Sequence, residues 1–306
     1  MLTKGDDFPL HQTSEPIAFA GTDRNFYDRY FFNGYSPDGS IFFAAAMGFY
    51  PQLGIVDASF CVIAGGGQHN LRASRRSGGE RLELSVGPIA LEIDMPLEIV
   101  TLRIAPNDGP LAGELRFTGR HFPIEEPRFI RRNGTRLFMD YTRMTQNGHW
   151  SGWLAVGGER IETGTGWTGT RDRSWGIRPA GASEPQPPPE GNFSQFFWLW
   201  TPCNFESSSL FFHSNDDGAR KPWYHPAVVR ERGRGGGTVG ALHPSPPLAL
   251  AVAAGRVAPR HHPALAVAAA VDRDRSRGRG SRRRGPAVLR VAVRGRQQRQ
   301  EGQGRG

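Results

Sequence analysis

The sequence predicts an all-β protein made of antiparallel strands, on three observations. Short segments with alternating apolar and polar residues follow one another between turns rich in Gly, Pro and Asn. The 40 Gly and 24 Pro residues interrupt this 306-residue chain too often for a helical bundle. No segment combines helical periodicity with recognisable helix caps. We therefore expect an up-and-down barrel or a strongly bent sheet.

The first expected strands lie in the N-terminal part of the chain. They cover residues 26–35, 41–50, 56–63, 81–86, 89–93, 97–105 and 113–122. The segment SPDGS (36–40) has the composition of a turn between the first two strands, and three consecutive glycines (65–67) end the third.

A meander is expected next. Its strands cover 128–132, 136–144, 149–156 and 160–168, and the turns between them are Asn133-Gly134, Asn147-Gly148 and Gly157-Gly158. Asn-Gly between β-rich segments is a strong hairpin signal, because both residues tolerate a positive φ. Four successive strands at hairpin spacing favour closure of the sheet into a barrel.

Four regions are expected along the chain. Residues 1–182 form a first β-barrel, and the Pro-rich segment SEPQPPPEG (183–191) is a stiff linker. Residues 192–224 start the same pattern again, because QFFW (195–198) and LFFH (210–213) resemble RYFF (29–32) and IFFA (41–44). We interpret 192–224 as the truncated start of a second barrel and 225–306 as a disordered tail.

The tail differs from the rest of the chain in charge and composition. Residues 1–224 carry 21 Lys and Arg and 25 Asp and Glu, whereas residues 225–306 carry 17 Arg and only four acidic residues. All 32 Phe, Trp and Tyr residues lie at or before Tyr224. The formal net charge of +9 therefore comes from the tail alone.

Two interpretations of this tail remain open. Arg, Gly, Ala, Val and Pro dominate it, and all five have codons rich in G and C, so a change of reading frame near Trp223–His225 explains the composition. The alternative is an Arg- and Gly-rich arm that binds nucleic-acid phosphates. The tail lacks the aromatic residues needed for base stacking, so no specific nucleic-acid partner is expected. Leu and Val are its only large hydrophobic residues, and Pro and Arg interrupt its apolar stretch, which predicts that it does not pack.

The most unusual segment is GTGWTGTRDRSWGIRP (164–179). It places Asp172 between Arg171 and Arg173, and two tryptophans, Trp167 and Trp175, flank the group. Guanidinium groups keep a carboxylate ionised, whereas an apolar cavity lets it retain a proton and act as a general acid. The structural alternative is that the Arg-Asp-Arg group locks a domain corner at a turn ending in Gly176, with the tryptophans as packing.

This segment resembles the Gly-aromatic-x-Asp-x-x-Trp-Gly signature of the carotenoid 1,2-hydratase and AttH-like proteins. RYFFNGYSPDGSIFFAAAMGFYP and QFFWLWTPCNF are similar to a bacterial branch of that family, and the resemblance covers about residues 10–224. The resemblance implies tandem lipocalin-like barrels that enclose hydrophobic ligands. In the hydratases it also implies acid-catalysed addition of water to an isoprenoid double bond. Arg173 stands where hydratases usually carry a His, which departs from the catalytic pattern.

The aromatic content independently suggests a hydrophobic ligand. Most rings belong to the core, but a minority that line a pocket inside the barrel would suit a terpenoid, a steroid or a polycyclic compound. The candidates are Trp167, Trp175, Tyr141, Trp150, Trp153 and Trp200, with Asp172, Arg171 and Arg173 as candidate catalytic residues. A hydratase or isomerase is one hypothesis, a non-catalytic lipophilic carrier is the second, and nucleic-acid binding through the tail is the third.

Other classes of function are disfavoured. No phosphate-binding loop, dinucleotide fingerprint or serine-hydrolase elbow is present in the sequence, and His11, His69 and His121 lack the spacing of a metal site. We expect no cofactor and no metal. The sequence contains no apolar run long enough to span a membrane, and the N-terminal MLTKGDDFPL lacks a signal-peptide core, which predicts a cytoplasmic protein.

Overall fold

A computed structural model describes residues 1–11, 14, 16–19, 21–180, 196–206, 208–217, 222–231, 266–270 and 290–294. The chain divides into two units, Met1–Val239 and Gly240–Gly306. The predicted linker (183–191) and most of the predicted tail lie outside the described residues. Helices in the described part are three short 3-10 turns, and none is long or apolar enough to cross a membrane.

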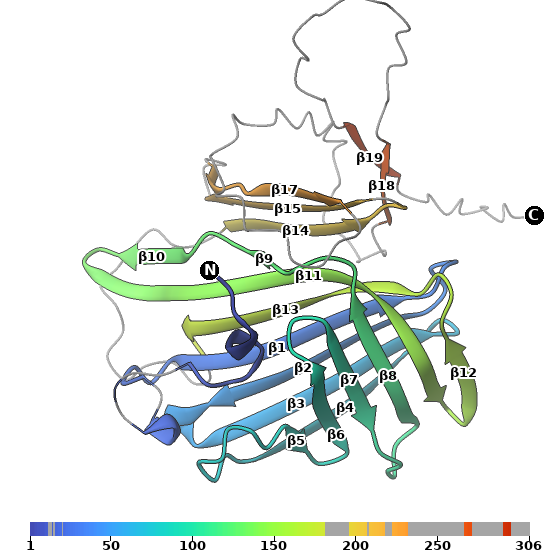
Figure 1. The fold of residues 1–306 in the computed structure, drawn as a ribbon, viewed down its shortest axis with the longest axis horizontal. Helices are drawn as coiled ribbons and strands as arrows, with labels where there is room; N and C mark the ends of the chain where they lie inside the picture. Colours follow the sequence, from blue (N-terminus) through green and yellow to red (C-terminus); the bar gives the residue numbers. More distant parts are fainter. Residues whose placement is uncertain are drawn as a thin grey trace, which may run out of the picture. The chain divides into compact units, whose positions relative to one another are not determined.

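The elements follow one another along the chain as a run of strands (Figure 1). The 3-10 turns are η1 (Lys4–Asp7), η2 (Ile17–Phe19) and η3 (Pro51–Leu53). The strands of the large sheet are β1 (Phe26–Tyr35), β2 (Phe42–Tyr50), β3 (Ile55–Ala64), β4 (Gly67–Arg76), β5 (Ser85–Val86), β6 (Ile89–Met95), β7 (Ile99–Ile104), β8 (Leu111–Gly119), β9 (Ile124–Glu125), β10 (Phe129–Asn133), β11 (Arg136–Val156), β12 (Glu159–Thr163) and β13 (Thr168–Ile177). The later strands are β14 (Phe196–Asn204), β15 (Ser208–Asp217), β16 (Pro222–Tyr224), β17 (Ala227–Glu231), β18 (Ala266–Ala270) and β19 (Arg290–Arg294).

The large sheet is a nearly closed antiparallel barrel, which confirms the predicted fold class. Its strand order is β4-β3-β2-β1-β13-β11-β8-β7-β6-β5, and β9, β10 and β12 pair with the long strand β11. The two edges meet through Arg75 of β4. Its Nε donates a hydrogen bond to the backbone oxygen of Ser85 at 2.7 Å, and its Nη2 donates to the backbone oxygen of Glu83 at 2.7 Å. A side chain therefore bridges the two edges of the sheet.

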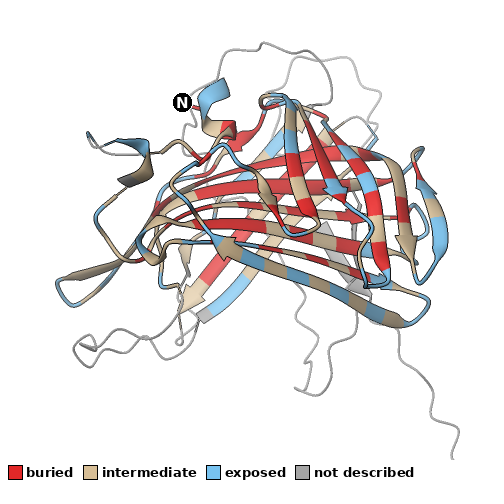
Figure 2. Ribbon diagram, turned by 90° about the horizontal axis from the view of Figure 1, so that it is seen from below, coloured by how far each residue is buried: buried red, intermediate tan, exposed pale blue. Residues whose placement is uncertain are grey.

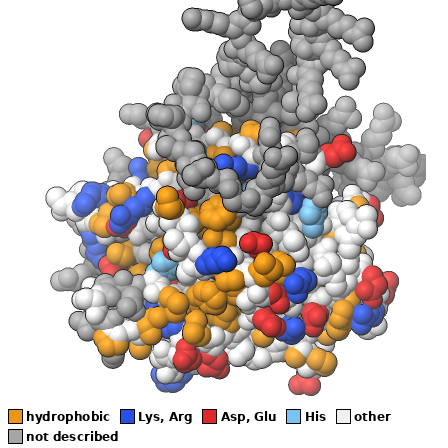
Figure 3. All heavy atoms as spheres, in the orientation of Figure 1, with side chains coloured by type: hydrophobic (Ala, Val, Ile, Leu, Met, Phe, Trp, Pro, Cys, Tyr) orange, Lys and Arg blue, Asp and Glu red, His pale blue; other side chains and the backbone are white. Residues whose placement is uncertain are grey.

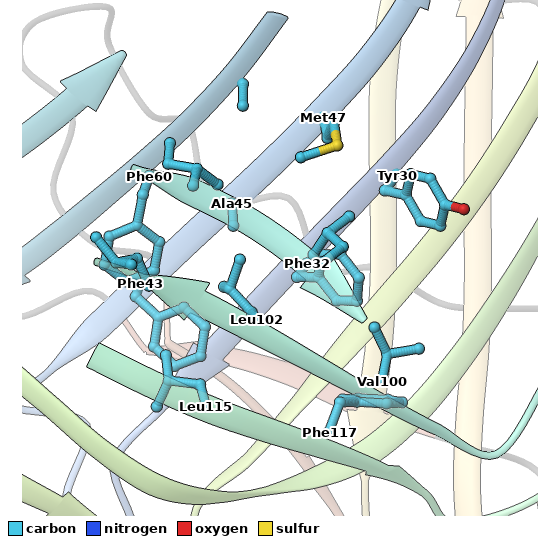
Figure 4. Close-up of a cluster of buried hydrophobic side chains, with 14 of the residues drawn as sticks. Tyr30, Phe32, Phe43, Ala45, Met47, Phe60, Val100, Leu102, Leu115 and Phe117 are labelled. Carbon is cyan, nitrogen blue, oxygen red and sulfur yellow. The ribbon is translucent and has the colours of Figure 1, made fainter. Parts of the chain in front are cut away.

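The interior of the barrel is filled with hydrophobic side chains from opposite walls. Burial alternates along the central strands, as the pleat of a strand requires (Figure 2). Side chains from β1, β2, β3, β7 and β8 point toward one another in Figure 4. The Trp150 ring lies at the centre of this packing, with its centroid 5.0 Å from that of Phe43 and 5.2 Å from that of Phe117.

A row of glycines makes room for these rings. Gly34, Gly169, Gly148 and Gly119 are register neighbours on four adjacent strands, β1, β13, β11 and β8. A Cβ atom at Gly148 would stand 2.2 Å from the Phe117 ring, and one at Gly169 would stand 2.5 Å from the Trp150 indole nitrogen. The aromatic rings therefore lie directly against the backbone.

This packing explains why the predicted turn at Asn147-Gly148 is wrong. Strand β11 runs without a break from Arg136 to Val156, and Asn147 pairs with Thr170 of β13. Gly148 is required for close packing in an extended strand, not for a positive φ in a turn. The hairpin turns at Gly134 and at Gly157-Gly158 do form, with positive φ at all three glycines.

Three other boundaries differ from the prediction. The polar segment Gly67–Arg76 forms β4, which the sequence analysis did not anticipate. The predicted strand 81–86 shrinks to the two residues of β5. The predicted strand 160–168 ends at Thr163, and the Arg-Asp-Arg group lies inside β13, in the middle of the sheet and not at a corner.

The N-terminal segment lies against the interior side of β13, where buried ion pairs hold it. Asp7 accepts hydrogen bonds from Nη1 and Nη2 of Arg171 at 2.8 and 3.2 Å and from the Leu97 backbone at 2.5 Å. Arg173 pairs with the buried carboxylate of Asp28 and donates to the backbone oxygen of Phe8 at 2.7 Å. Residues far apart in sequence thus meet at one end of the barrel.

The exterior of β6, β7 and β8 carries charged side chains of both signs. Arg103 pairs with Glu114 at 3.1 Å, and Arg116 pairs with Asp94 at 3.4 Å. Figure 3 shows charged and hydrophobic side chains interspersed on the face that these strands present. Exposed pairs of this kind contribute at most about 1 kcal/mol each.

A second sheet in the same unit contains β14, β15, β16 and β17. Strand β17 begins at Ala227, beyond the predicted end of packing at Tyr224, and it pairs with the first half of β15. Strands β18 and β19 pair with each other in the second unit. The described residues contain this four-stranded sheet where the sequence predicts the start of a second barrel, and the second barrel itself stays a prediction.

Candidate functional site

Strand β13 presents opposite side chains to two environments. Arg171 and Arg173 point to the barrel interior, where the Arg171 guanidinium lies 5.6 Å from the Phe117 ring centroid and that of Arg173 lies 4.0 Å from the Tyr30 centroid. Because successive residues of a strand face opposite sides, Asp172 points away from the barrel interior. The guanidinium groups next to Asp172 in sequence are therefore engaged elsewhere, with Asp7 and Asp28.

Asp172 lines a cavity of about 840 Å³ between the outer side of the barrel wall and the second sheet. The sequence predicts a ligand inside the barrel, but this cavity lies outside it, because packed hydrophobic side chains occupy the interior. This volume suits a small organic molecule of drug size. The cavity is lined by Arg29, Phe31, Asn33, Phe129, Met139, Tyr141, Arg143, Asp172, Arg178, Trp198, Trp200, Asn215 and Trp223. Six of these are aromatic, and the charged ones lie on or directly after strands of the barrel wall.

Few hydrogen bonds offset the cost of burying the carboxyl group of Asp172. The residue is 4% exposed, and its Oδ1 atom has no hydrogen-bond partner among the described residues. Burial raises the pKa of Asp172 above the ordinary value, although Arg29 and Arg143 act in the opposite direction. A buried carboxyl group with a raised pKa retains its proton more readily and is suited to proton donation.

Tyr141 and Trp200 form part of the same cavity. The Tyr141 ring stacks on Phe129 with centroids 4.6 Å apart, and burial raises the pKa of Tyr141 to about 12. The Trp200 ring meets Phe31 edge-on at 6.3 Å, and its Nε1 is a buried donor without a partner among the described residues. These residues supply aromatic faces together with two hydrogen-bond donors, the Tyr141 hydroxyl and the Trp200 indole N–H.

A charged network joins the barrel wall to the second sheet beside the cavity. Glu126 accepts two hydrogen bonds from Arg143, at 2.8 and 2.6 Å, and a third from Thr145. Nδ1 of His213, on β15, lies 2.8 Å from Nη2 of Arg143, and the Tyr224 hydroxyl donates to the Pro127 backbone oxygen at 3.0 Å. The second sheet is thus fixed to the barrel through buried polar contacts.

The network also sets the ionisation of its own members. Burial alone would raise the pKa of Glu126, but Arg143 and the hydrogen bonds from His213 and Thr145 lower it to about 2. Burial lowers the pKa of His213. Arg143 therefore faces the cavity with its charge already balanced by Glu126.

The structure separates the other candidate residues from the cavity. Trp150 and Trp167 belong to the barrel core. Trp175 stacks on His11, with ring centroids 3.8 Å apart, and Trp153 lies under the Arg160 guanidinium at 4.3 Å. Of the six aromatic residues proposed from sequence, Tyr141 and Trp200 lie with Asp172, and four do not.

Several cavity residues were missed in the sequence analysis. Arg29, Phe31 and Asn33 alternate along β1 and share its outer side. Period-2 alternation could have grouped them, but aromatic residues occupy both faces of this strand and hide the signal. The sequence around Arg143 and Glu126 contains no recognisable motif. Among the described residues, no three His, Cys, Asp or Glu side chains come together as a metal site.

Comparisons with known proteins place the chain in a family but assign no activity. The family model described as "Family of unknown function (DUF8625)" matches residues 2–278. No curated protein matches the chain. Two of the solved structures that resemble it are kievitone hydratase from Nectria haematococca and CghA.

The likeness to these structures is distant. For kievitone hydratase the identity is 11% and the TM-score 0.45, over 73% of this chain and 69% of that one. For CghA the identity is 12% and the TM-score 0.41, over 74% of this chain and 65% of that one. At such values the function has to be argued from the residues of the cavity.

Proposed function

The chain belongs to the family of unknown function DUF8625, and from the chemistry of its cavity we propose that it binds a hydrophobic small molecule there and protonates a carbon–carbon double bond of that molecule. The reaction class is hydration or isomerisation. The observation that carries the proposal is Asp172, a buried carboxyl group with an unpartnered oxygen in an aromatic cavity.

Several features of the lining favour an apolar ligand. Phe31, Phe129, Trp198, Trp200 and Trp223 are among the residues that line the cavity. Large aromatic side chains bind terpenoid, steroid or polycyclic compounds by excluding water from both surfaces. The faces of the rings also attract a cation, so they would stabilise a carbocation formed inside the cavity.

The proposed reaction balances with water as the only co-reactant. Asp172 gives its carboxyl proton to one alkene carbon, and the π electrons form the new C–H bond. The neighbouring carbon becomes a cation. In hydration, a water oxygen forms the C–O bond and its released proton returns to the Asp172 carboxylate. In isomerisation, the cation loses a proton from an adjacent carbon to the same carboxylate.

Tyr141 suits a supporting role in this reaction. A pKa raised to about 12 keeps its hydroxyl group protonated at neutral pH, so it donates a hydrogen bond and does not compete as a base. A water molecule that accepts this hydrogen bond keeps a second lone pair on its oxygen for attack on the cation. Arg171 and Arg173 act as positioning residues, because their ion pairs on the other side of β13 hold the strand that carries Asp172.

The carrier hypothesis uses the same cavity without proton transfer. Asp172→Asn separates the two hypotheses, because it keeps the shape of the side chain and removes the acid. The substrates are farnesol, geranylgeraniol and the corresponding carboxylic acids, incubated with the protein in D₂O and analysed by mass spectrometry. Deuterium incorporation reports isomerisation, and addition of D₂O reports hydration.

We expect Asp172→Asn to lower turnover by about 100-fold or more, as the loss of a general acid does. The matched control is Asp94→Asn, which changes a carboxyl group on β6 that is hydrogen-bonded to Thr101 and does not line this cavity. Binding is followed by quenching of tryptophan fluorescence. Unchanged turnover in Asp172→Asn would exclude the acid role, and binding without turnover in the native protein would favour the carrier.

A further inference from the structure

The cavity contains guanidinium groups that form no direct ion pair with a carboxylate among the described residues. Arg29, Arg143 and Arg178 all line it. Arg143 is paired with Glu126 through two hydrogen bonds. Within the described part of the chain, no ion pair joins Arg29 or Arg178 to a carboxylate, and Nε of Arg29 is buried without a hydrogen-bond partner. Both side chains are partly exposed, so their remaining N–H donors are available to an anion that enters the cavity.

Asp172 does not form an ion pair with Arg29, although the charge of Arg29 lowers the pKa of Asp172. It is opposite Phe31 in the pairing of β1 with β13, whereas Arg29 is opposite Ser174. Arg29 and Asp172 are therefore diagonal neighbours, separated by roughly 7–8 Å at the backbone. No ion pair between them is present in the described structure, which leaves room for a ligand group between the two side chains.

Arg178 is held at the same wall by aromatic rings. Its guanidinium lies 4.8 Å from the ring centroid of Tyr27 and 5.9 Å from that of Tyr141. Stacking of this kind fixes the orientation of the planar group but leaves its N–H donors available at the edge. Two guanidinium groups thus sit at the barrel wall, facing the aromatic residues Trp198 and Trp200 of the second sheet.

We propose that the ligand of this cavity is an amphipathic acid, whose carboxylate binds Arg29 and Arg178 and whose apolar body packs on Trp200 and Tyr141. This inference rests on the proposed ligand-binding function and specifies its substrate class. Arg29 is then a specificity-determining residue, since a neutral analogue leaves its guanidinium group unpaired.

The test uses two fluorescent probes with the same apolar body. These are 1-pyrenebutyric acid and 1-pyrenebutanol, and binding is measured by energy transfer from tryptophan to pyrene. We expect the acid to bind about tenfold more tightly than the alcohol, as one charge-assisted contact gives. Arg29→Met should weaken binding of the acid by about tenfold and leave the alcohol unchanged, and Arg29→Lys should restore part of the loss.

The control variant is Arg116→Met, which removes a half-exposed guanidinium on the outer face of β8 and should change neither affinity. Equal affinities for acid and alcohol would overturn the inference and leave the proposed function standing. An equal loss for both probes in Arg29→Met would also overturn it, because the role would be structural. Failure of both probes to bind would remove the proposed function as well. If Arg29→Met does not fold, Arg178→Met provides the same comparison.

Discussion

Replacing Glu126 by Gln tests the network that fixes the second sheet to the barrel. The Glu126 side chain is completely buried, and the carboxylate is the counter-ion of Arg143, which is 7% exposed at its side chain. The substitution keeps the shape of the side chain and one acceptor oxygen but leaves the Arg143 charge buried and unpaired. We expect the folded state to lose stability at neutral pH, because removing one member of a buried ion pair leaves the other uncompensated.

The magnitude follows from the ionisation of Glu126. Its pKa is about 2 in the folded protein and 4.5 as the ordinary value, so the native state favours the ionised form. This difference corresponds to about 3 kcal/mol of stabilisation at neutral pH. Since the folded pKa is the lower one, the contribution is fully present above pH 5 and is lost as the pH falls toward 2.

Urea denaturation of both proteins at pH 7, 5 and 3 measures this contribution. The difference in unfolding free energy should be about 3 kcal/mol at pH 7 and should shrink at pH 3. Glu162→Gln is the control, because Glu162 is 70% exposed in its pair with Arg160 and should give less than about 0.5 kcal/mol. A difference that is independent of pH would refute the reasoning. If Glu126→Gln does not fold, adding Arg143→Met should restore folding by removing the unpaired charge.

Three further predictions concern single positions. Gly148→Ala should destabilise the protein by about 3 kcal/mol in urea denaturation, because its Cβ would overlap a phenyl ring and a backbone oxygen, whereas Gly164→Ala, with open space around it, should be neutral. Asp7→Asn should cost about 3 kcal/mol by leaving Arg171 unpaired, and a loss below about 1 kcal/mol would contradict the importance of that ion pair. Asp172→Asn should raise the melting temperature at pH 7, since ionisation of a buried group with a raised pKa weakens the fold as the pH rises; a lower melting temperature would contradict this.

The sequence predicted those strands in which apolar and polar residues alternate regularly. The segments that became β1, β2, β3, β6, β7 and β8 combine alternation with β-branched or aromatic residues. Strand β4 was missed because its residues, GQHNLRASRR, carry no apolar stripe. The break expected at Asn147-Gly148 failed for another reason, since glycine in an extended strand and glycine in a turn look the same until the ring that covers it is known.

The site was harder to predict than the fold. Asp172 was singled out because of its unusual neighbours, yet those neighbours face the other side of the sheet. Tyr141 and Trp200 were proposed with it, and both line the cavity. Trp150 and Trp167 could not be distinguished from cavity residues, because core packing and ligand binding select the same aromatic side chains. Arg29 and Arg178 required the strand pairing to be known.

The composition change near Tyr224 requires a separate test. The family match continues to residue 278, so it includes more than half of the Arg- and Gly-rich segment. Strand β17 lies beyond the change and pairs with β15. The reading-frame interpretation stays a prediction, and sequencing of the gene around codon 224 tests it directly. A continuous frame, with the Arg-rich segment confirmed in the expressed protein, would contradict it.

The ion pairs of the N-terminal segment have a practical consequence for work on this protein. Because Asp7 and the Phe8 carbonyl accept hydrogen bonds from the two arginines on either side of Asp172, removing the first eight residues would leave both buried guanidinium groups without these partners. A shortened expression clone would then lose stability although every residue of the cavity is unchanged. The integrity of the amino terminus should be verified by mass spectrometry before an inactive preparation is interpreted.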